Sequence, residues 1–159
     1  MPVSRRRFAR LLALLIPAIR VSASSFPGAD EWRLSPEEWR ERLTSNQFYI
    51  LRDHGTERPW TSPLNDEERT GSYHCAGCDL LLFSSEHKYD SGTGWPSFWR
   101  PAEEDHLGTQ ADFKMIWPRT EYHCARCLGH QGHVFDDGPR PTGKRYCNNG
   151  YGLIFRPQI

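Results

Sequence analysis

The chain has 159 residues with twenty basic and twenty acidic side chains, so its formal net charge is zero. This length suits one domain with a real core and is short of two. All five charged residues before position 24 are arginines, which leaves fifteen basic and twenty acidic side chains in the rest, a formal charge of −5. Non-specific binding of nucleic acid needs a basic face, so this balance argues against that class of function.

The first 23 residues have the pattern of an export signal. Residues 4–10 read SRRRFAR, an apolar run follows at residues 11–16, and small residues up to Ala23 suit a cleavage site. The apolar run is far shorter than the roughly 20 residues that span a bilayer. The Arg5-Arg6 pair resembles the bacterial twin-arginine signal, while a basic amphipathic helix or arm is the alternative. We therefore expect a signal peptide over residues 1–23, a periplasmic mature protein and no stable membrane insertion after cleavage.

Helices are expected near the start of the domain, which we place at residues 34–157. The run Ser35-Pro-Glu-Glu38 is a capping box with proline at the first helical position, so a helix should start there. A second short helical piece is expected over residues 47–53, ending at Gly55. Thirteen glycines and twelve prolines predict many turns and few long helices.

From Gly71 onwards, short β-like runs alternate with turns. This pattern indicates a mainly β fold, with a small antiparallel sheet or barrel and the helices packed at one end. The aromatic content of 13% predicts a core that depends on rings more than on aliphatic side chains. The expected strands cover residues 72–74, 80–83, 113–116, 121–123, 133–135, 145–147 and 153–156.

Two Cys-x-x-Cys pairs form the strongest motif of the chain. The runs YHCAGC and YHCARC around them share five of six residues, and the pairs are Cys75 with Cys78 and Cys124 with Cys127. Four thiolates match the tetrahedral preference of zinc. Closing the loop between the pairs costs roughly 3 kcal/mol, whereas a structural zinc contributes about 10–16 kcal/mol. We therefore expect one structural Zn²⁺ per chain, with no open coordination position for chemistry.

Other arrangements of the same four cysteines stay open at this point. In an exported protein they could form two disulfides, in any of three connectivities. A redox-active Cys-x-x-Cys is a second alternative, and iron of the rubredoxin type fits the same ligands.

Residues 129–149 carry the candidate chemistry. They include His130, His133 and Cys147, the one cysteine outside the Cys-x-x-Cys pairs. Turn-forming residues in the middle of the stretch could carry the histidines towards Arg145 and Cys147. A thiol reacts as thiolate, and cationic or histidine neighbours lower its pKa from about 8.5. Because only about 3% would be thiolate at pH 7 at that value, we expect such neighbours to lower the pKa of Cys147.

Three motifs together resemble the B-type peptide methionine sulfoxide reductases. They read YDSGTGWPSF at residues 89–98, GHQGHVFDDGP at residues 129–139 and TGKRYC at residues 142–147. The similarity runs from about Leu34 to Pro157 and includes both cysteine pairs. The family reduces methionine-R-sulfoxide in proteins and as the free amino acid, and its fold is two small antiparallel sheets.

The resemblance implies that Cys147 is the nucleophile that attacks the sulfoxide sulfur, with Arg145 helping to hold it as thiolate. Attack would yield methionine and a cysteine sulfenic acid. The four paired cysteines match the zinc ligands of the family one for one.

The resemblance also implies how the sulfoxide is held. His130, His133 and Asn149 would bind or protonate the leaving oxygen, with Asp137 orienting a histidine. Trp95 would form the wall that receives the methyl group.

Each of these residues has a simpler explanation when it is taken alone. Trp95 would then be a core residue, and either histidine would be hydrogen-bonded and structural. Asp137 would belong to a turn, and Cys147 would be a small buried hydrophobe. Their joint presence in the order of the family favours the catalytic interpretation.

Three positions depart from the pattern of the family. Thr93 stands where many members have a second cysteine, so we expect an external thiol, from a thioredoxin-like protein, to regenerate Cys147. Asn148 and Gly150 stand where many members have an aliphatic residue and a serine. We expect these two residues to loosen or rewet the floor of the pocket.

Two rival functions use the same features differently. One is a non-catalytic zinc-ribbon module that binds a partner through its aromatic residues. The other is a cysteine hydrolase or transpeptidase built on Cys147 and His133, which would need no reductant.

Overall fold

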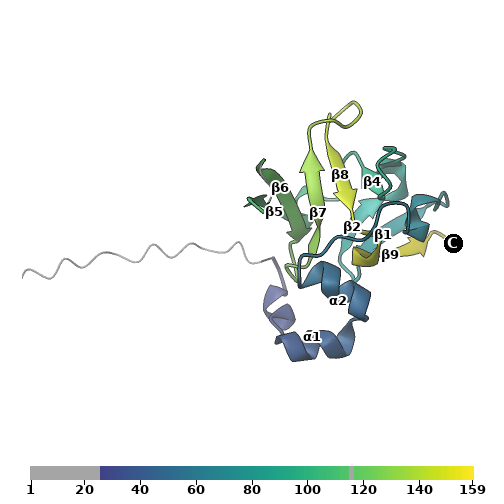
Figure 1. Ribbon diagram of the computed structural model, residues 1–159. Coiled ribbons are helices and arrows are strands. Elements are labelled where there is room, and N and C mark those ends of the chain that lie inside the picture. The colour runs from purple at the N-terminus through teal and green to yellow at the C-terminus, as the bar shows by residue number, and fades with distance from the viewer. Residues whose placement is uncertain (1–25, 115–116) are drawn as a thin grey trace, which may run out of the picture.

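The computed structural model describes residues 26–114 and 117–159, which form two antiparallel sheets with two short α-helices at one end (Figure 1). The expected fold class, mainly β with two antiparallel sheets and N-terminal helices, is confirmed. The expected export signal lies outside the described residues. Within the described ranges, no helix is both long and apolar enough to cross a membrane.

Two capping boxes start the two helices, α1 (Pro36–Arg42) and α2 (Ser45–Leu51). The Ser35 hydroxyl accepts from the backbone N–H of Glu38, whose carboxylate accepts from the backbone N–H of Ser35, as expected. Thr44 and Gln47 repeat both hydrogen bonds at the start of α2. The second helix therefore begins and ends two residues before the expected segment, because a second capping box was overlooked.

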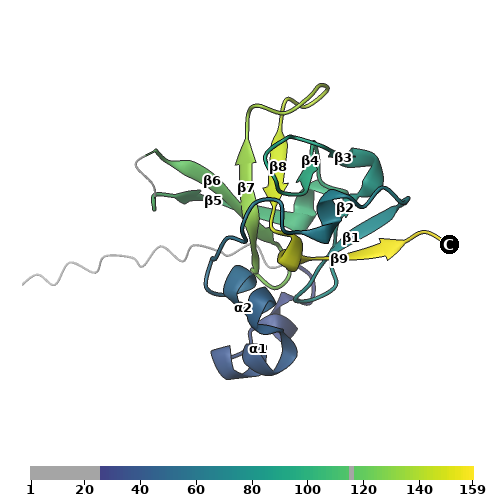
Figure 2. The same ribbon diagram turned by 45° about the vertical axis from the view of Figure 1, so that its right-hand side comes forward.

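The larger sheet has the strand order β3-β4-β8-β7-β6-β5, and the smaller sheet has the order β2-β1-β9. Figure 2 shows the two sheets beside each other, with α1 and α2 below them. The strands of the larger sheet are β3 (Lys88–Tyr89), β4 (Ser97–Phe98), β5 (Leu107–Asp112), β6 (Arg119–Cys124), β7 (His130–Phe135) and β8 (Arg145–Asn148). Those of the smaller sheet are β1 (Gly71–Cys75), β2 (Leu81–Ser84) and β9 (Leu153–Pro157).

Six of the seven expected strands are present, with small differences at their ends. The expected strand at residues 113–116 is wrong, because β5 ends at Asp112 and both Phe113 and Lys114 lie outside it. β5 is the edge strand of the larger sheet, and the side chains of its residues 109–111 are exposed. Its sequence therefore lacks the apolar alternation that marks a half-buried strand. β3 and β4 have two residues each, too few to show any period.

Aromatic rings from both sheets form the core. Phe83 of β2 stacks on Phe98 of β4 with ring centroids 4.2 Å apart, and Tyr73 of β1 meets Phe98 edge-on at 4.9 Å. Tyr122 of β6 meets Phe83 edge-on at 6.1 Å. All four side chains are fully buried. Each such pair contributes about 0.5–1.5 kcal/mol beyond its buried area, so the core depends on rings as the composition predicted.

Glu57 ties the loop after α2 to the segment that follows β8. Its carboxylate accepts from the backbone N–H of Gly150 at 2.5 Å and from that of Tyr151 at 3.3 Å. Its own backbone N–H donates to the side-chain oxygen of Asn149 at 3.0 Å. A buried carboxylate needs such donors, so these bonds fix the chain just beyond Cys147.

Gly150 is required by the close approach of Ser62. A Cβ at position 150 would lie 1.9 Å from the Ser62 hydroxyl oxygen, which accepts from the backbone N–H of Leu64. Ser62 therefore fills the space beside Gly150. This packing contradicts the expectation that Gly150 loosens the floor of the pocket.

Replacing Gly150 by alanine should lower the free energy of unfolding by about 1–3 kcal/mol, the usual cost of overpacking. The double variant Ser62→Gly/Gly150→Ala should recover most of the loss, because the clashing hydroxyl is gone. Urea unfolding of wild type, both single variants and the double variant measures this. Additive losses in the double variant would show that the two positions do not compete for space.

Candidate functional site

Cys147 lies in β8, between β4 and β7. Its partner residues across the sheet are Ser97 on β4 and His133 on β7. Trp95 comes just before β4 and Asn149 directly after β8. Strand pairing thus brings Trp95, His133, Cys147 and Asn149 to one pocket of about 120 Å³. The remaining lining residues are Thr56, Arg119, Gly132, Phe135 and Asn148.

The half-buried position of Cys147 raises the pKa of its thiol above the ordinary value. Arg145 and the Thr93 hydroxyl lower this pKa, but burial outweighs both. Arg145 therefore lowers the pKa of Cys147 as expected, but by less than burial raises it. At neutral pH the resting residue is a thiol.

Asp137 contacts Arg145 and not a histidine. The Arg145 guanidinium donates from Nε and Nη2 to the two carboxylate oxygens of Asp137, each at 2.8 Å. It also lies over the Phe135 ring, 4.3 Å from the centroid. The expected role of Asp137 in orienting a histidine is therefore wrong. Asp137 orients Arg145, the cation that acts on Cys147.

Asp112 is the carboxylate that holds His133, with Nε2 of the ring 2.7 Å from Oδ2. The backbone N–H of Lys114, together with His133 and Arg119, keeps the pKa of Asp112 well below its usual range. An ionised carboxylate only accepts, so His133 donates through Nε2. Burial lowers the pKa of His133. In the neutral ring, Nδ1 is then the proton acceptor.

His130 lies behind His133, with ring centroids 5.5 Å apart, and is not among the residues that line the pocket. Its Nδ1 lies 2.8 Å from Oε1 of Glu121. Burial raises the pKa of Glu121, but hydrogen bonds from His130 and Gln110 outweigh it and the net shift is downward. Burial lowers the pKa of His130. This second histidine is therefore also neutral at pH 7, with Nδ1 as its donor.

Asn149 and Trp95 are both fixed through Glu57. The Asn149 amide accepts from the Glu57 backbone N–H and donates to the Gln131 carbonyl, each at 3.0 Å. The Trp95 indole N–H donates to the Glu57 carbonyl at 3.1 Å. The loop after α2 thus sets the position of two pocket residues.

Asn148 makes the floor of the pocket polar. Its side chain is 1% exposed, and its amide oxygen and nitrogen have no hydrogen-bond partner among the described residues. A buried amide without partners favours a water molecule or a polar ligand group beside it. The expectation that Asn148 makes the pocket floor more accessible to water therefore has a physical basis.

Sequence reasoning missed the three buried carboxylates of the site, Glu57, Asp112 and Glu121. Carboxylates are almost never buried without partners, so each burial marks a fixed contact. Two signals were available: Glu57 lies in the Gly55-Thr-Glu57 run shared with the family, and Glu121 is a charged residue inside an expected strand. Asp112 gave none, because it lies at the end of a strand that was not predicted and is 21 residues from His133.

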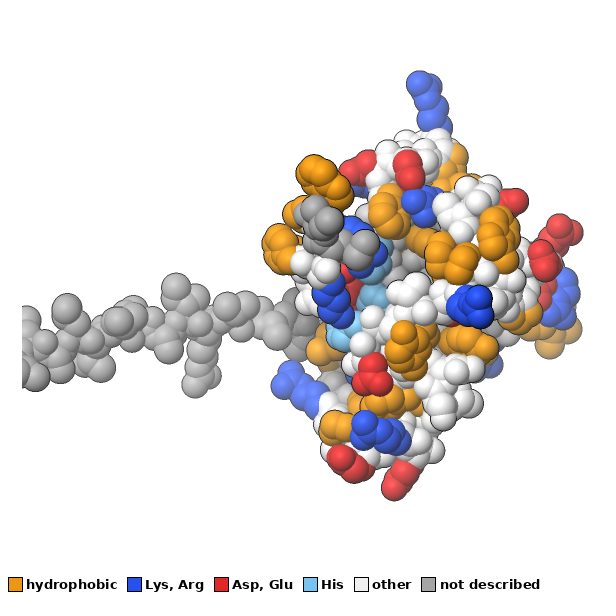
Figure 3. Space-filling view, viewed as in Figure 1, with side chains coloured by type: hydrophobic (Ala, Val, Ile, Leu, Met, Phe, Trp, Pro, Cys, Tyr) orange, Lys and Arg blue, Asp and Glu red, His pale blue; other side chains and the backbone are white. Residues whose placement is uncertain are grey.

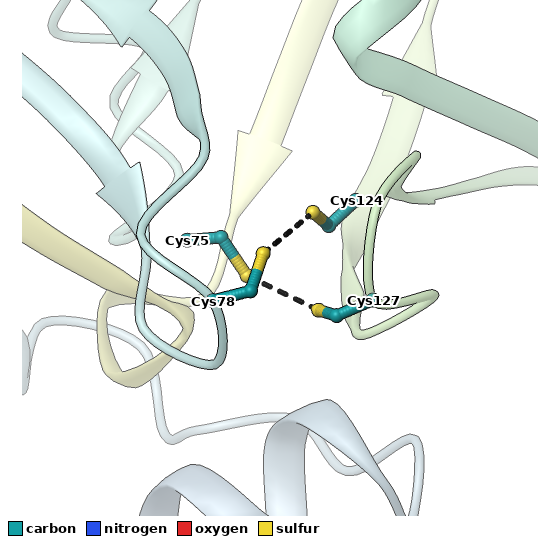
Figure 4. Close-up of side chains that lie close together, drawn as sticks. All are labelled: Cys75, Cys78, Cys124 and Cys127. Atoms are coloured by element: carbon teal, nitrogen blue, oxygen red, sulfur yellow. Dashed lines mark hydrogen bonds between the residues drawn. The ribbon is translucent and has the colours of Figure 1, made fainter. Parts of the chain in front are cut away.

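The four paired cysteines meet where β1 and β6 end (Figure 4). The sulfurs of Cys75 and Cys127 lie 3.6 Å apart, those of Cys78 and Cys124 lie 3.5 Å apart, and all four lie within 4.8 Å of one another. Sulfurs about 2.3 Å from a tetrahedral zinc would lie roughly 3.8 Å apart. All four cysteines are buried and free, which contradicts the disulfide alternative. They could hold a metal ion.

The two cysteine turns are structural copies, as their sequences are. Each has a hydrogen bond from the residue after the second cysteine to the carbonyl of the first, from Asp79 at 2.8 Å and from Leu128 at 2.9 Å. Both residues have a left-handed backbone, with φ of 62° and 59°. The repeated sequence therefore produces a repeated turn.

Two side chains donate to the cysteine sulfurs. Arg52 donates to the sulfur of Cys127 at 3.3 Å, and Gln131 donates to that of Cys75 at 3.4 Å. Donors around a buried cluster stabilise negative charge on sulfur, which suits a metal-bound thiolate.

Alkylation of Cys147 should follow its raised pKa. The rate with iodoacetamide should still be rising at about pH 9, where an ordinary thiol with a pKa of about 8.5 is already largely ionised. Arg145→Met should move the profile further up, because it removes the cation that lowers the pKa. Arg140→Met, at an exposed position in the loop that precedes β8, should leave it unchanged. Peptide mapping by mass spectrometry gives the rates, and a thiol that is fully reactive at neutral pH would contradict the burial effect.

Comparison with known proteins agrees with this site. Residues 43–157 match the family model described as the SelR domain. The chain is 50% identical over 123 residues to "Peptide methionine sulfoxide reductase MsrB" of Agrobacterium fabrum, which covers 77% of this chain and 91% of that protein. It is 51% identical over 122 residues to the protein of the same name from Pseudomonas putida, covering 77% and 92%. It is 54% identical over 121 residues to "Peptide methionine sulfoxide reductase B1, chloroplastic" of Oryza sativa subsp. japonica, covering 76% and 56%. The chain therefore belongs to the SelR-domain family of MsrB-type peptide methionine sulfoxide reductases, which are oxidoreductases.

Proposed function

We propose that this enzyme reduces the R epimer of methionine sulfoxide in proteins and peptides, with Cys147 as nucleophile and a sulfenic acid as the oxidised product. The observation that carries the proposal is the shared pocket of Cys147, His133 and Trp95. A soft nucleophile, a proton carrier and an aromatic wall are what attack on a methyl sulfoxide requires. Membership of a reductase family gives no support to the rival hydrolase or zinc-ribbon functions.

The resting protonation state supplies the proton that the reaction needs. Thiol plus sulfoxide gives sulfenic acid plus thioether, so the net step takes up no external proton. Sγ of Cys147 forms a bond to the substrate sulfur while the S–O bond breaks. The released hydroxide then adds to Sγ as the new S–S bond breaks, which frees methionine and leaves the sulfenic acid. His133, which donates to Asp112 through Nε2, accepts the thiol proton on Nδ1 and passes it to the leaving oxygen. A raised thiol pKa is therefore compatible with catalysis at neutral pH.

The other predicted residues support this step. Arg145, fixed by Asp137, stabilises the thiolate while it forms. Asn149 donates one amide hydrogen to Gln131 and presents the second to the sulfoxide oxygen. His130 stands behind His133 as a second proton carrier, held by Glu121. Its burial outside the pocket lining makes its contribution smaller.

We further propose that the four paired cysteines hold one structural zinc. Two sulfur pairs, each at the end of a strand, are then joined by a metal with closed coordination. The zinc clamps the two sheets together and takes no part in the reduction.

Recycling is proposed to use an external thiol. All cysteines other than Cys147 belong to the metal cluster, and Thr93 offers a hydroxyl, which bonds to Ser91 at 2.8 Å. A thioredoxin-like protein would attack the sulfenic acid to give a mixed disulfide, which its second thiol resolves. Export through the N-terminal arginine signal would place the enzyme in the periplasm, where such a donor must be fed from the membrane.

Substitution of Cys147 or of Asp112 should lower activity without unfolding the protein. Cys147→Ser should be folded and inactive. Asp112→Asn should lose roughly 10²- to 10⁴-fold in rate, because the His133 ring would no longer be held with its proton on Nε2. Asp136→Asn, an exposed aspartate of the β7–β8 loop, is the matched control and should keep full activity. Thiol-dependent turnover of a peptide with one defined sulfoxide epimer measures the rates, alongside melting curves. Equal turnover of the S epimer, or an active Cys147→Ser, would refute the assignment.

Metal content and stability should change together at the cysteine cluster. Protein made without added metal should carry one zinc per chain, and Cys124→Ser should lose it along with several kcal/mol of stability. Cys147→Ser is the matched control and should keep both metal and melting temperature. Elemental analysis and thermal unfolding test this, and a Cys124→Ser variant that melts like wild type would rule out the clamp.

A further inference from the structure

We propose a second metal site, formed by His54, Glu121 and His130, for a divalent first-row transition cation. The three residues come from separate parts of the chain: the loop after α2, strand β6 and the start of β7. One nitrogen from each histidine and one carboxylate oxygen lie within 4.8 Å of one another. This site shares no residue with the cysteine cluster.

The distances suit coordination by a single ion. Nδ1 of His54 lies 3.1 Å from Oε1 of Glu121, and Nδ1 of His130 lies 2.8 Å from the same oxygen. Ligand atoms bound at about 2.0–2.2 Å in tetrahedral or octahedral geometry lie roughly 2.8–3.6 Å apart. The two measured distances therefore fall in the range of a formed site, and the two histidine nitrogens lie within 4.8 Å of each other.

The ligands are held in place without the ion. Gln110 donates to Oε2 of Glu121 at 3.1 Å, which leaves Oε1 directed at both histidines. Glu121 and His130 are buried, at 5% and 2% exposed. His54 has a left-handed backbone with φ of 53°, an uncommon state for a residue with a side chain. Such a conformation persists only where its surroundings fix it, and here it aims the ring at Glu121.

Two imidazoles and one carboxylate form a donor set that selects transition cations over Ca²⁺ or Mg²⁺. Three ligands leave coordination positions open, and the partly exposed His54 gives water access to them. Figure 3 shows histidine side chains gathered in a hollow of the surface, next to acidic and basic groups. Asp112, which lines the same pocket as His54 and Glu121, is already paired with His133 and Arg119, and Lys114 also lines this pocket.

Binding would replace the hydrogen bond between His130 Nδ1 and Glu121, and the 3.1 Å contact between His54 Nδ1 and Glu121, with metal bonds. The single proton of the neutral His130 ring would move from Nδ1 to Nε2 by exchange with solvent, which frees Nδ1 to bind the ion. The alternative is that Glu121 simply orients the two imidazoles, His130 through a hydrogen bond and His54 through a close contact. The proposal concerns binding alone: in the metal-bound state His130 is a ligand, and the proposed proton transfer runs through His133 only.

The test is titration of Zn²⁺ into untagged, full-length protein that has first been loaded with one equivalent, followed by isothermal calorimetry. We expect a second equivalent to bind. His54→Ala should weaken this event at least about tenfold, since even outer-shell changes at metal sites cost roughly 10- to 100-fold. His87→Ala is the matched control: it removes a histidine that packs against Trp99, away from the cluster, and should bind like wild type.

Two further outcomes decide the assignment. Cys147→Ser should retain the second binding event, which would exclude a site on the reactive thiol. Loss of the event in that variant, equal affinity in His54→Ala and wild type, or no second equivalent at all would overturn the proposal. His54 is on the surface loop, so melting curves should show its variant to be folded whichever result is obtained.

Discussion

Burial of Cys147 in the middle of the larger sheet is the constraint on which the chemistry depends. β8 pairs with β4 on one side and β7 on the other, so the thiol cannot be solvated as an exposed cysteine would be. The same pairing places His133 directly across from it. A thiol beside a neutral imidazole holds the one proton that sulfoxide reduction must move. The sheet thus places the proposed nucleophile and its proposed proton carrier on paired strands in the resting state.

Buried carboxylates hold the two histidines of the site in fixed positions. Asp112 and Glu121 each accept from one histidine, and both keep their charge because hydrogen bonds outweigh the cost of burial. Glu57 accepts from the backbone N–H groups of Gly150 and Tyr151 just beyond β8, although burial raises its pKa. A buried carboxylate that lost its donors would cost several kcal/mol, so each is coupled to the folding of its neighbourhood. Stability and site geometry are therefore set by the same contacts.

Much of the fold could be predicted from local sequence, and the site only in part. The capping box at Ser35 and the repeated cysteine turns are local patterns, and both are present as expected. The predicted role of Asp137 was wrong because the pairing of the β7–β8 hairpin places its carboxylate next to Arg145. The prediction for Gly150 was wrong because Ser62, the residue that fills the space beside it, lies far away in the chain. Side chains that depend on strand register or on a distant loop leave no mark in their own neighbourhood.

The protonation state of His133 in the resting enzyme is the most direct measure of this account. Nitrogen-15 spectra of the histidine rings at neutral pH, assigned with a His133→Gln variant, report which ring nitrogens carry a proton. A neutral ring protonated on Nε2 alone, beside a Cys147 thiol, is the predicted result. A doubly protonated ring paired with a Cys147 thiolate would contradict it.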